Sequence, residues 1–314
     1  MALYLVTGGA GFIGSHLTDA ILAQGHQVRV LDDLSTGKRE NLDPRCDLQL
    51  GDVADAAAVR RAMQGVAGVF HLAAIASVQR SNEAWLETHR TNLSGTIAVL
   101  EAARDAGRVP MVYASSAAIY GDQGAGAIRE TATPQPSTAY GADKYGSELH
   151  ARIGFGVHGV PTLGCRFFNV YGPRQDPKSP YSGVISIFAA RFAAGQGVTI
   201  HGDGGQTRDF VYVADVVRHL LAGMELLHQA PQAAVFNVCT GRATSVLDLA
   251  KTLAAVNGRP AALSFSAGRA GDIRESLGSP AAATAALGVR ARMPLEEGLR
   301  LTCNSLRVEM QQAA

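Results

Sequence analysis

A glycine-rich turn at residues 7–16 constrains the fold of this chain more than any other stretch. An apolar run, residues 3–6, precedes the turn, and apolar residues recur behind it at helical spacing. The pattern predicts a strand, a tight turn and a helix. Gly8 and Gly11 would form the turn and allow close approach to a phosphate, while Gly14 would let the helix pack on the strand. Because the N–H groups of a helix N-terminus attract phosphate charge, we expect a dinucleotide-binding site here.

The next expected strand, residues 28–31, supports this interpretation. The glycine spacing is G-x-x-G-x-x-G, which a tight turn without a ligand would also use, so the context matters. The strand ends in Asp32 and Asp33, and a carboxylate there can accept hydrogen bonds from the adenosine ribose. Its charge would repel a 2′-phosphate, which favours NAD over NADP. Lys38 and Arg39 are weaker candidates for a 2′-phosphate site because they lie farther along the loop.

Composition excludes several other classes of protein. A length of 314 residues allows one large domain or two, and a net charge of +1 gives no reason to expect nucleic acid or an anionic membrane as a partner. The four cysteines are far apart and fit no metal spacing, so we expect free thiols and no metal site. We expect neither a signal peptide nor a membrane span, and therefore a cytoplasmic protein.

Strand and helix patterns alternate through the first half of the chain. Further strands are expected at 48–50, 69–72, 109–114 and 161–166, with helices at 55–64, 92–106 and 139–157. Strands separated by helices predict a Rossmann-type α/β fold, a doubly wound parallel sheet covered on both faces. Ligands bind such sheets beyond the carboxyl ends of the strands. His71, on an apolar strand, is expected to be a packed histidine and not a ligand.

The second half is less regular. A loop at 171–183 should be followed by helices at 184–195, 214–228, 245–257 and 294–310 and by strands at 198–201, 210–213 and 235–238. We therefore expect an NAD-binding Rossmann domain over residues 1–170, to which segments of the second half return. Residues 171–314 would form a smaller mixed α/β region that binds mainly the substrate.

A tyrosine and a lysine in the expected helix at 139–157 indicate the chemistry. Tyr140 and Lys144 stand four residues apart and so share one helix face. A nearby ammonium and a positively charged nicotinamide would lower the pKa of the tyrosine and favour its phenolate. Ser116, at the end of the strand at 109–114, can hydrogen-bond the same substrate oxygen. Together the three residues can remove a hydroxyl proton while hydride leaves the carbon.

These motifs resemble those of the extended short-chain dehydrogenases/reductases, and within them the UDP-glucose 4-epimerase family. The resemblance runs from the glycine turn to the Gly-Arg-Ala-Gly-Asp run at 268–272. It implies that Tyr140 is the base, Lys144 its partner and Ser116 a proton-relay hydroxyl. It also implies a set of NAD-binding residues: Gly8, Gly11, Phe12, Ile13, Gly14, Asp32, Asp33, Ser35, Thr36, Gly37, Asp52, Val53, Leu72, Ala73, Ala74, Asn92, Tyr140, Lys144 and Phe167.

The resemblance further implies a UDP-sugar site in the second half. Asn169 would touch the diphosphate, Thr199 and His201 would flank the uracil, and Asp272 would hold the uridine ribose. Arg208 and Arg269 would bind the diphosphate through paired, charge-assisted hydrogen bonds. Ala76, Ser77, Val184 and Ser276 complete the implied substrate site, together with Ser116 and Tyr140.

Related enzymes with other reactions share this scaffold. Nucleotide-sugar 4,6-dehydratases and decarboxylases carry a glutamate after the serine or threonine, where this chain has Ala117 and Ala118. Alanine cannot carry a proton, so the sequence favours a UDP-hexose 4-epimerase that oxidises C4, rotates the keto sugar and returns the hydride. A UDP-glucuronate 4-epimerase, a 4,6-dehydratase and a sugar dehydrogenase remain alternatives, and a non-catalytic NAD-binding sensor is a further one.

One position bears on the choice of sugar. Relatives restricted to glucose and galactose carry a tyrosine four residues after the ribose-binding aspartate, where this chain has Ser276. The smaller side chain leaves room for a 2-acetamido group, as in the UDP-N-acetylglucosamine 4-epimerase branch. Ala76 and the run at 174–177 agree with that branch. Family habit implies a homodimer through the helices at 92–106 and 139–157, although their apolar residues could equally be internal core.

Overall fold

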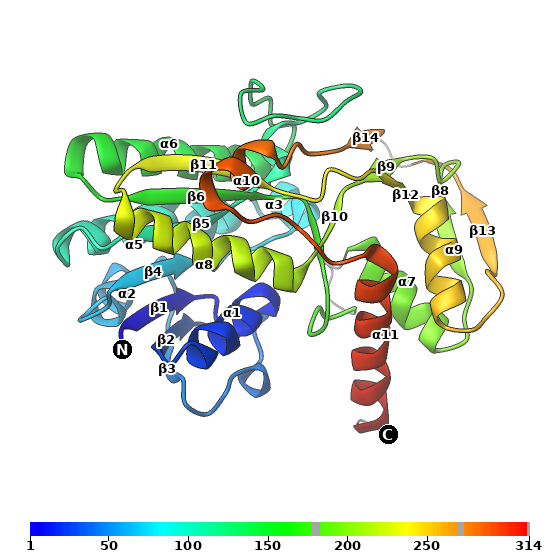
Figure 1. The fold of residues 1–314 in the computed structure, drawn as a ribbon, viewed down its shortest axis with the longest axis horizontal. Helices are drawn as coiled ribbons and strands as arrows, with labels where there is room; N and C mark the ends of the chain where they lie inside the picture. Colours follow the sequence, from blue (N-terminus) through cyan, green and yellow to red (C-terminus); the bar gives the residue numbers. More distant parts are fainter. Residues whose placement is uncertain (178–182, 269–272, 313–314) are drawn as a thin grey trace.

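A sheet of seven parallel strands forms the centre of the molecule. The structure, a computed structural model, describes residues 1–177, 183–268 and 273–312. The sheet order is β11-β6-β5-β4-β1-β2-β3 (Figure 1). The strands are β1 Leu3–Thr7, β2 Gln27–Asp32, β3 Asp47–Leu50, β4 Gly68–His71, β5 Met111–Ser116, β6 Thr162–Phe167 and β11 Ala233–Val238. The order reverses between β1 and β4, and this reversal opens a crevice at the carboxyl edge. The expected doubly wound, Rossmann-type fold is confirmed.

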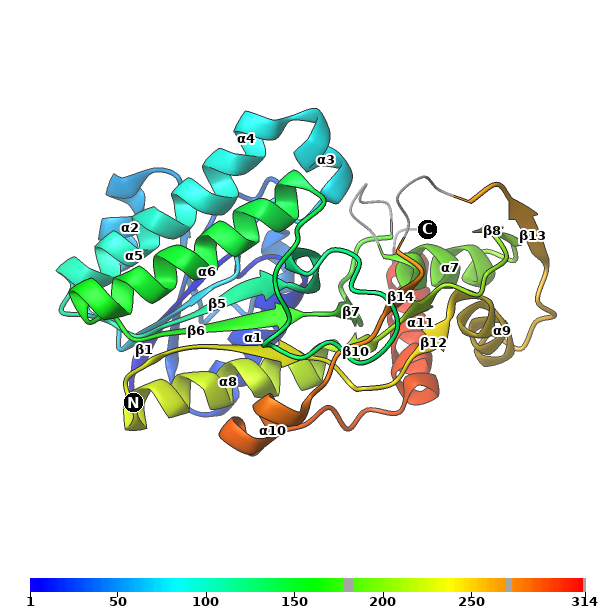
Figure 2. The ribbon, with the colours of Figure 1, turned by 90° about the horizontal axis from the view of Figure 1, so that it is seen from above.

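Helices cover both faces of this sheet (Figure 2). One layer contains α2 Ala56–Ala62, α5 Gly95–Asp105 and α6 Ala139–His158, which share an apolar core with the sheet. The other contains α1 Phe12–Ala23 and α8 Val213–Gln229, with α10 Ala281–Leu287 beside them. Both α8 and β11 come from the second half of the chain, yet they complete the sheet and its cover.

Local capping explains where α6 begins and ends. The Thr138 hydroxyl accepts a hydrogen bond from the N–H of Gly141 (3.1 Å) and so caps the first turn. Gly159 ends the helix with a φ of 71°, in the left-handed region that favours glycine. The twenty residues between them hold Tyr140 and Lys144 in a rigid element.

The segment before α5 differs from the sequence prediction. The helix expected from residue 92 is preceded by α3 Val78–Glu83 and α4 Trp85–His89, and α4 continues through the π-helical turn η2, Arg90–Ser94, into α5. Trp85 and Leu86 are 70% and 81% exposed, so the apolar residues of α4 do not face the core. An outward-facing helix of this kind lacks the periodicity that predicts helices.

The remaining elements form a smaller mixed region at the carboxyl edge of the sheet (Figures 1 and 2). Helices α7 Val184–Ala193, α9 Val246–Val256 and α11 Leu295–Gln312 share its apolar core. Its short strands are β7 Asn169–Tyr171, β8 Val198–His201, β9 Thr207–Arg208, β10 Phe210–Tyr212, β12 Thr244–Ser245, β13 Leu263–Ser266 and β14 Glu275–Ser276, and single 3₁₀ turns lie at η1 Arg39–Asn41 and η3 Ala117–Ile119. Within the described ranges, no helix is both long and apolar enough to cross a membrane.

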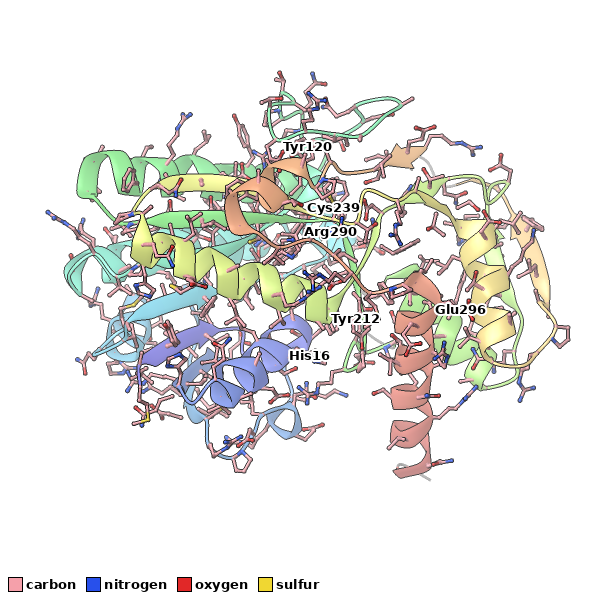
Figure 3. All side chains as sticks on the ribbon, viewed as in Figure 1. His16, Tyr120, Tyr212, Cys239, Arg290 and Glu296 are labelled. Carbon is pink, nitrogen blue, oxygen red and sulfur yellow. The ribbon has the colours of Figure 1, made fainter. Side chains whose placement is uncertain are left out.

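A buried ion pair joins α6 to the sheet. Arg166 on β6 donates two hydrogen bonds to Glu148 on α6, at 2.9 and 2.6 Å, and the two side chains are 5% and 6% exposed. Ser115 donates a third to Glu148 (2.5 Å), and Arg166 also donates to the hydroxyl of Tyr120 (2.8 Å), labelled in Figure 3. Because the oxygens and N–H groups of the pair have partners, its burial is tolerated. The network fixes α6 against β5 and β6.

We predict that Arg166→Met lowers the free energy of unfolding by about 3–5 kcal/mol, because it leaves the Glu148 carboxylate buried without its counter-charge. Chemical denaturation of the two proteins measures this difference. Arg45→Met is the matched control: Arg45 is 66% exposed and pairs with nearby Asp43, so its loss should cost about 1 kcal/mol or less. Equal effects of the two substitutions would contradict the prediction.

Candidate active site

A cavity of about 1560 Å³ lies where the carboxyl ends of the parallel strands meet the smaller region. Pockets for a single drug-sized ligand are commonly about 300–1,000 Å³, so there is room for a dinucleotide and a second ligand. The lining includes all the expected NAD-binding residues except Asn92: Gly8, Gly11, Phe12, Ile13, Gly14, Asp32, Asp33, Ser35, Thr36, Gly37, Asp52, Val53, Leu72, Ala73, Ala74, Tyr140, Lys144 and Phe167.

The glycine turn brings bare backbone to the floor of this cavity. Gly8 has a φ of 70°, and a Cβ atom there would lie 2.7 Å from the amide nitrogen of Ala73. A Cβ at Gly14 would lie 2.1 Å from the carbonyl oxygen of Gly8. Helix α1 follows Gly11 and has no side-chain cap, so the N–H groups of its first turn are left for a ligand. These features fit the pyrophosphate of a dinucleotide.

Asp32 stands at the next strand end with both oxygens engaged by backbone. Oδ2 accepts from the N–H of Ala10 and Oδ1 from that of Leu34, each at 2.9 Å. Burial raises the pKa of this carboxyl, and the two backbone hydrogen bonds oppose that rise. A carboxylate oxygen has a further lone pair, so the group can still accept from a ribose hydroxyl. Lys38, the rival candidate, also lines the cavity and lies 4.0 Å from Asp176.

Asn92 lies behind the cavity and supports its wall. It is fully buried on η2, where it accepts a hydrogen bond from the N–H of Ile75 (2.8 Å) and donates one to the same residue's carbonyl (3.2 Å). Ile75 belongs to the loop after β4, which also carries Ala73 and Ala74. Asn92 therefore fixes a loop that lines the cavity, while its own side chain is not among the described lining residues.

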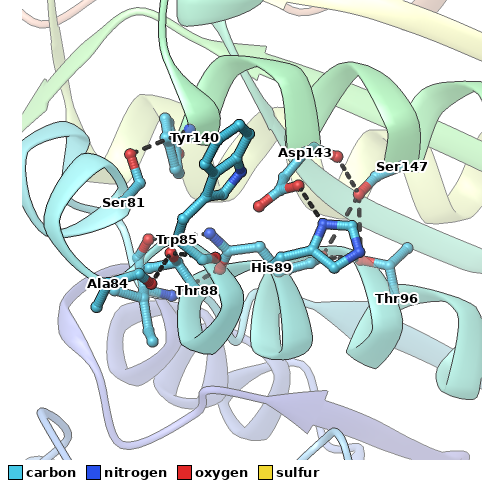
Figure 4. Close-up of polar contacts among 11 residues, drawn as sticks. Ser81, Ala84, Trp85, Thr88, His89, Thr96, Tyr140, Asp143 and Ser147 are labelled. Carbon is cyan, nitrogen blue, oxygen red and sulfur yellow. Dashed lines mark hydrogen bonds and ion pairs between the residues drawn. The ribbon is translucent and has the colours of Figure 1, made fainter.

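Tyr140, Lys144 and Ser116 meet in the middle of the cavity. The Lys144 ammonium donates to the carbonyl of Ala114 (3.0 Å) and lies 5.8 Å from the centre of the Tyr140 ring. Tyr140 and Ser116 share a side-chain hydrogen bond. The backbone N–H of Tyr140 donates to the hydroxyl of Ser81 (3.1 Å), a contact drawn in Figure 4. The three side chains expected to act together therefore lie close to one another.

Burial dominates the titration of this pair within the chain alone. Burial raises the pKa of Tyr140, and the hydrogen bond to Ser116 only partly offsets the rise. Burial also lowers the pKa of Lys144 to about 8, and the negative charge of Asp143 opposes this lowering. The lowering expected from the ammonium together with a positively charged nicotinamide stays a prediction, while the groups of the chain alone favour the neutral tyrosine. The reason is desolvation, which opposes charge on both partners and cannot be seen in a residue pattern.

His71 is a packed residue, as its apolar strand indicated. Its ring is hydrogen-bonded to the hydroxyls of Thr7 (2.7 Å) and Thr96 (3.0 Å). Burial lowers its pKa to about 3, so the ring is neutral at physiological pH. Among the described residues, no three His, Cys, Asp or Glu side chains gather in a way that could hold a metal ion.

The expected substrate residues divide into three sets. Ala76, Ser116, Tyr140, Asn169 and Val184 line the cavity. Ser77, Thr199, His201, Arg208 and Ser276 are not among its described lining residues. Arg269 and Asp272 lie outside the described residues.

The second set has other contacts. The Ser77 hydroxyl caps α3 by accepting from the N–H of Arg80 (2.9 Å). Arg208 donates to the carbonyls of Thr207 and Ile273, both at 2.8 Å, and its strand pairs in register with that of Ser276. Thr199 and His201 are hydrogen-bonded to serines of β13, each at 2.9 Å. Apart from Ser77, these side chains lie on β8, β9 and β14 of the smaller region.

Two further segments line the cavity that the sequence did not predict. One is α4 with the start of η2, which contributes Leu86, Glu87, Arg90 and Thr91. The other is residues 174–176, which lie against α1. There Arg174 reaches Asp19 (2.8 Å), and His16, labelled in Figure 3, donates to the carbonyl of Pro173 (2.9 Å). The proline-rich composition predicted only a loop and gave no signal for this contact.

Comparisons with known proteins agree with this geometry. Residues 4–239 match the NAD dependent epimerase/dehydratase family. The chain is 36% identical to a UDP-glucose 4-epimerase of Mycolicibacterium smegmatis, over 98% of this chain and 99% of that one. It is also 35% identical to a UDP-N-acetyl-alpha-D-glucosaminuronate decarboxylase of Bacillus cytotoxicus, over 70% of each chain.

Two solved structures share the fold over almost their whole length. One is the UDP-glucose 4-epimerase of Thermotoga maritima with UDP-glucose, with a TM-score of 0.94, 38% identity, and coverage of 98% of this chain and 99% of that one. The other is a UDP-N-acetylglucosamine 4-epimerase from Methanobrevibacter ruminantium M1 in complex with UDP-N-acetylmuramic acid. Its TM-score is 0.93 at 30% identity, with the same coverage.

Proposed function

The chain belongs to the NAD dependent epimerase/dehydratase family and is an NAD-dependent epimerase, and we propose that it interconverts the C4 epimers of UDP-hexoses. The proposed pairs are UDP-glucose with UDP-galactose and UDP-GlcNAc with UDP-GalNAc. In this proposal residues 1–170 mainly bind NAD and residues 171–314 mainly bind the UDP-sugar. Arg208, Arg269 and Asn169 would hold the diphosphate, with Asp272, Thr199 and His201 at the uridine.

The cluster of Tyr140, Ser116 and Lys144 beside the glycine turn carries this proposal. Tyr140 takes the proton from the C4 hydroxyl, Ser116 hydrogen-bonds the same oxygen, and the Lys144 ammonium stabilises the phenolate. NAD, held by the glycine turn and Asp32, would supply the acceptor for the C4 hydride and the donor for its return to the other face of the rotated sugar. Tyr140 would then give the proton back to the oxygen. The cycle would have no net redox change because C4 regains the hydride that it lost.

The residues after Ser116 favour epimerisation over the reactions of sister enzymes. Ala117 and Ala118 form η3, and the N–H of Ala118 donates to the Ser116 hydroxyl (3.1 Å). The acids among the described lining residues are Asp32, Asp33, Asp52, Glu87 and Asp176, none of which belongs to β5 or η3. Elimination of water needs an acid or base beyond the tyrosine. A decarboxylase relative shares the scaffold, but a dehydratase or decarboxylase would lack that group here.

We expect Tyr140→Phe to lower the turnover of UDP-glucose by about 10²–10⁴-fold while NAD stays bound, because the ring remains and only the proton-transferring hydroxyl is lost. Turnover is measured with the NAD retained by the purified protein and with none added. Tyr145→Phe, on the same helix but not among the described lining residues, is the control. Near-normal turnover in the Tyr140 variant would overturn the assignment, and net formation of NADH by the wild type would indicate a sugar dehydrogenase.

The finer part of the proposal is that the enzyme also accepts UDP-sugars with an N-acetyl group. Ser276 is half-buried on β14 beside Arg208, next to the segment that would hold the uridine ribose. The small side chains of Ser276 and of Ala76, which lines the cavity, support the proposal that a 2-acetamido group has space to bind. A UDP-N-acetylglucosamine 4-epimerase among the structural neighbours is consistent with this.

We predict that the wild type converts UDP-GlcNAc at least as well as UDP-glucose, and that Ser276→Tyr removes the N-acetyl activity by steric exclusion. The activity of the variant on UDP-glucose, largely spared, serves as the internal control for folding. Both activities are measured on the same preparations. A tyrosine variant that still converts UDP-GlcNAc would show that Ser276 does not select the sugar.

We also propose a homodimer through α5 and α6. Leu149, Ile153 and Val157 repeat every four residues on α6 and are 36%, 50% and 71% exposed. An exposed apolar stripe of this kind is typical of a helix that packs on a partner. A second copy of the chain would cover it.

Ile153→Arg should convert the dimer to a monomer, because it puts a charge into the centre of the stripe. Light scattering coupled to size-exclusion chromatography measures the mass of the particle. Leu50→Arg, at a 59% exposed position on β3, is the matched control and should leave the mass unchanged. A wild-type protein that is already monomeric would contradict the proposed dimer.

A further inference from the structure

A third ionisable residue lies between Tyr140 and Lys144 on α6. Asp143 is only 4% exposed. Its Oδ1 accepts a hydrogen bond from Nδ1 of His89, at 2.8 Å, as Figure 4 shows. Its Oδ2 is also buried and receives no hydrogen bond from the described residues. A buried carboxylate with one partner is costly unless nearby charge compensates it, so its surroundings require an explanation.

His89 ends α4, the helix that lines the cavity through Leu86 and Glu87. Its side chain is 41% exposed, whereas that of Asp143 is 6% exposed, so the imidazole reaches in from the surface. Helix α3, which precedes α4, also contacts α6, through the hydroxyl of Ser81, which accepts the N–H of Tyr140. Asp143 is therefore held in place from a neighbouring helix and is not free to turn toward solvent.

Lys144 is the charged group that Asp143 affects. It is 3% exposed, burial lowers its pKa to about 8, and the negative charge of Asp143 acts against that lowering. His71 on β4 is the other titratable group that interacts with Lys144, and it is neutral because burial lowers its pKa to about 3. One carboxylate thus provides the opposing charge for the buried ammonium.

The other charged groups near α6 have partners or lie at its outer end. The elements that pack most closely on α6 are α3, α4, α5, η2, η3, β5, β6 and β11. Their titratable and charged side chains are Arg80 and Glu83 on α3, Glu87 and His89 on α4, Glu101, Arg104 and Asp105 on α5, Arg90 on η2, Tyr113 on β5, and Cys165 and Arg166 on β6. Burial holds the Cys165 thiol neutral by raising its pKa. Ion pairs join Arg80 to Glu87, Arg90 to Asp52, Arg104 to Asp105 and Arg166 to Glu148. Burial holds Tyr113 neutral by raising its pKa.

We propose that Asp143, fixed by His89, is a positioning residue whose charge sets the pH range in which the Tyr140–Lys144 pair is active. This inference rests on the proposed roles of Tyr140 and Lys144. A nearby negative charge makes both a phenol and an ammonium hold their protons more tightly. The carboxylate therefore moves the active range to higher pH, and His89 moderates that effect by sharing the charge.

The test is the pH dependence of kcat/KM for UDP-glucose in Asp143→Asn, an isosteric change that keeps an acceptor for His89. Loss of the negative charge should shift both limbs of the profile to lower pH by about 1 unit. The pH at which half of Tyr140 is ionised should also move to lower values. It is measured from the phenolate absorbance, as the difference between otherwise identical chains with and without Tyr140→Phe. A lower rate at every pH with unmoved limbs would show a merely structural role and overturn the inference.

His89→Phe is the second variant and keeps the inference testable if Asp143→Asn folds poorly. It removes the hydrogen-bond donor to the Asp143 carboxylate, so the pH profile of kcat/KM should move to higher pH. In a chain that already carries Asp143→Asn, the same substitution should leave the profile unchanged. Asp105→Asn, an exposed carboxylate at the end of α5, is the control and should leave the limbs unmoved. Activity retained in Tyr140→Phe would refute the proposed function, whereas unmoved limbs with an inactive Tyr140→Phe refute only this inference.

Discussion

The reversal of strand order between β1 and β4 is the constraint on which the functional part of the molecule depends. Parallel strands send all their carboxyl ends to one edge, and the reversal leaves a crevice between the loops at that edge. The glycine turn after β1, Asp32 after β2 and the loop after β4 all open into it. The smaller region then covers the same edge, so one cavity serves both cofactor and substrate.

Helix α6 relates this cavity to the rest of the molecule. Its inner face carries Tyr140 and Lys144 and, one turn on, Glu148 in the buried pair with Arg166. Its outer face carries the apolar stripe around Ile153. A single rigid helix thus connects the reacting groups to the sheet on one side and to a surface on the other. A small displacement of α6 would therefore change the positions of the reacting groups, the buried ion pair and the apolar stripe.

Much of the fold and of the cofactor side could be predicted from the sequence because periodicity and glycine spacing are local signals. The parallel sheet, the glycine turn and Asp32 follow such signals, whereas Asp52, Val53 and residues 72–74 were implied by the family resemblance, and the structure brings all of them to one cavity. The α4 segment could not be predicted, because Trp85 and Leu86 face outward and break the helical pattern. The raised pKa of Tyr140 depends on burial by distant parts of the chain, which no spacing of residues reveals.

The position of β11 in the sheet has a consequence for the order in which the molecule can fold. β11 pairs with the outer edge of β6, and α8, which packs on the sheet beside α1, also comes late in the chain. A nascent chain that has emerged only as far as β6 therefore has an open strand edge and an uncovered apolar face. Such surfaces invite aggregation during synthesis. The nucleotide-binding sheet is therefore complete only when residue 238 has left the ribosome.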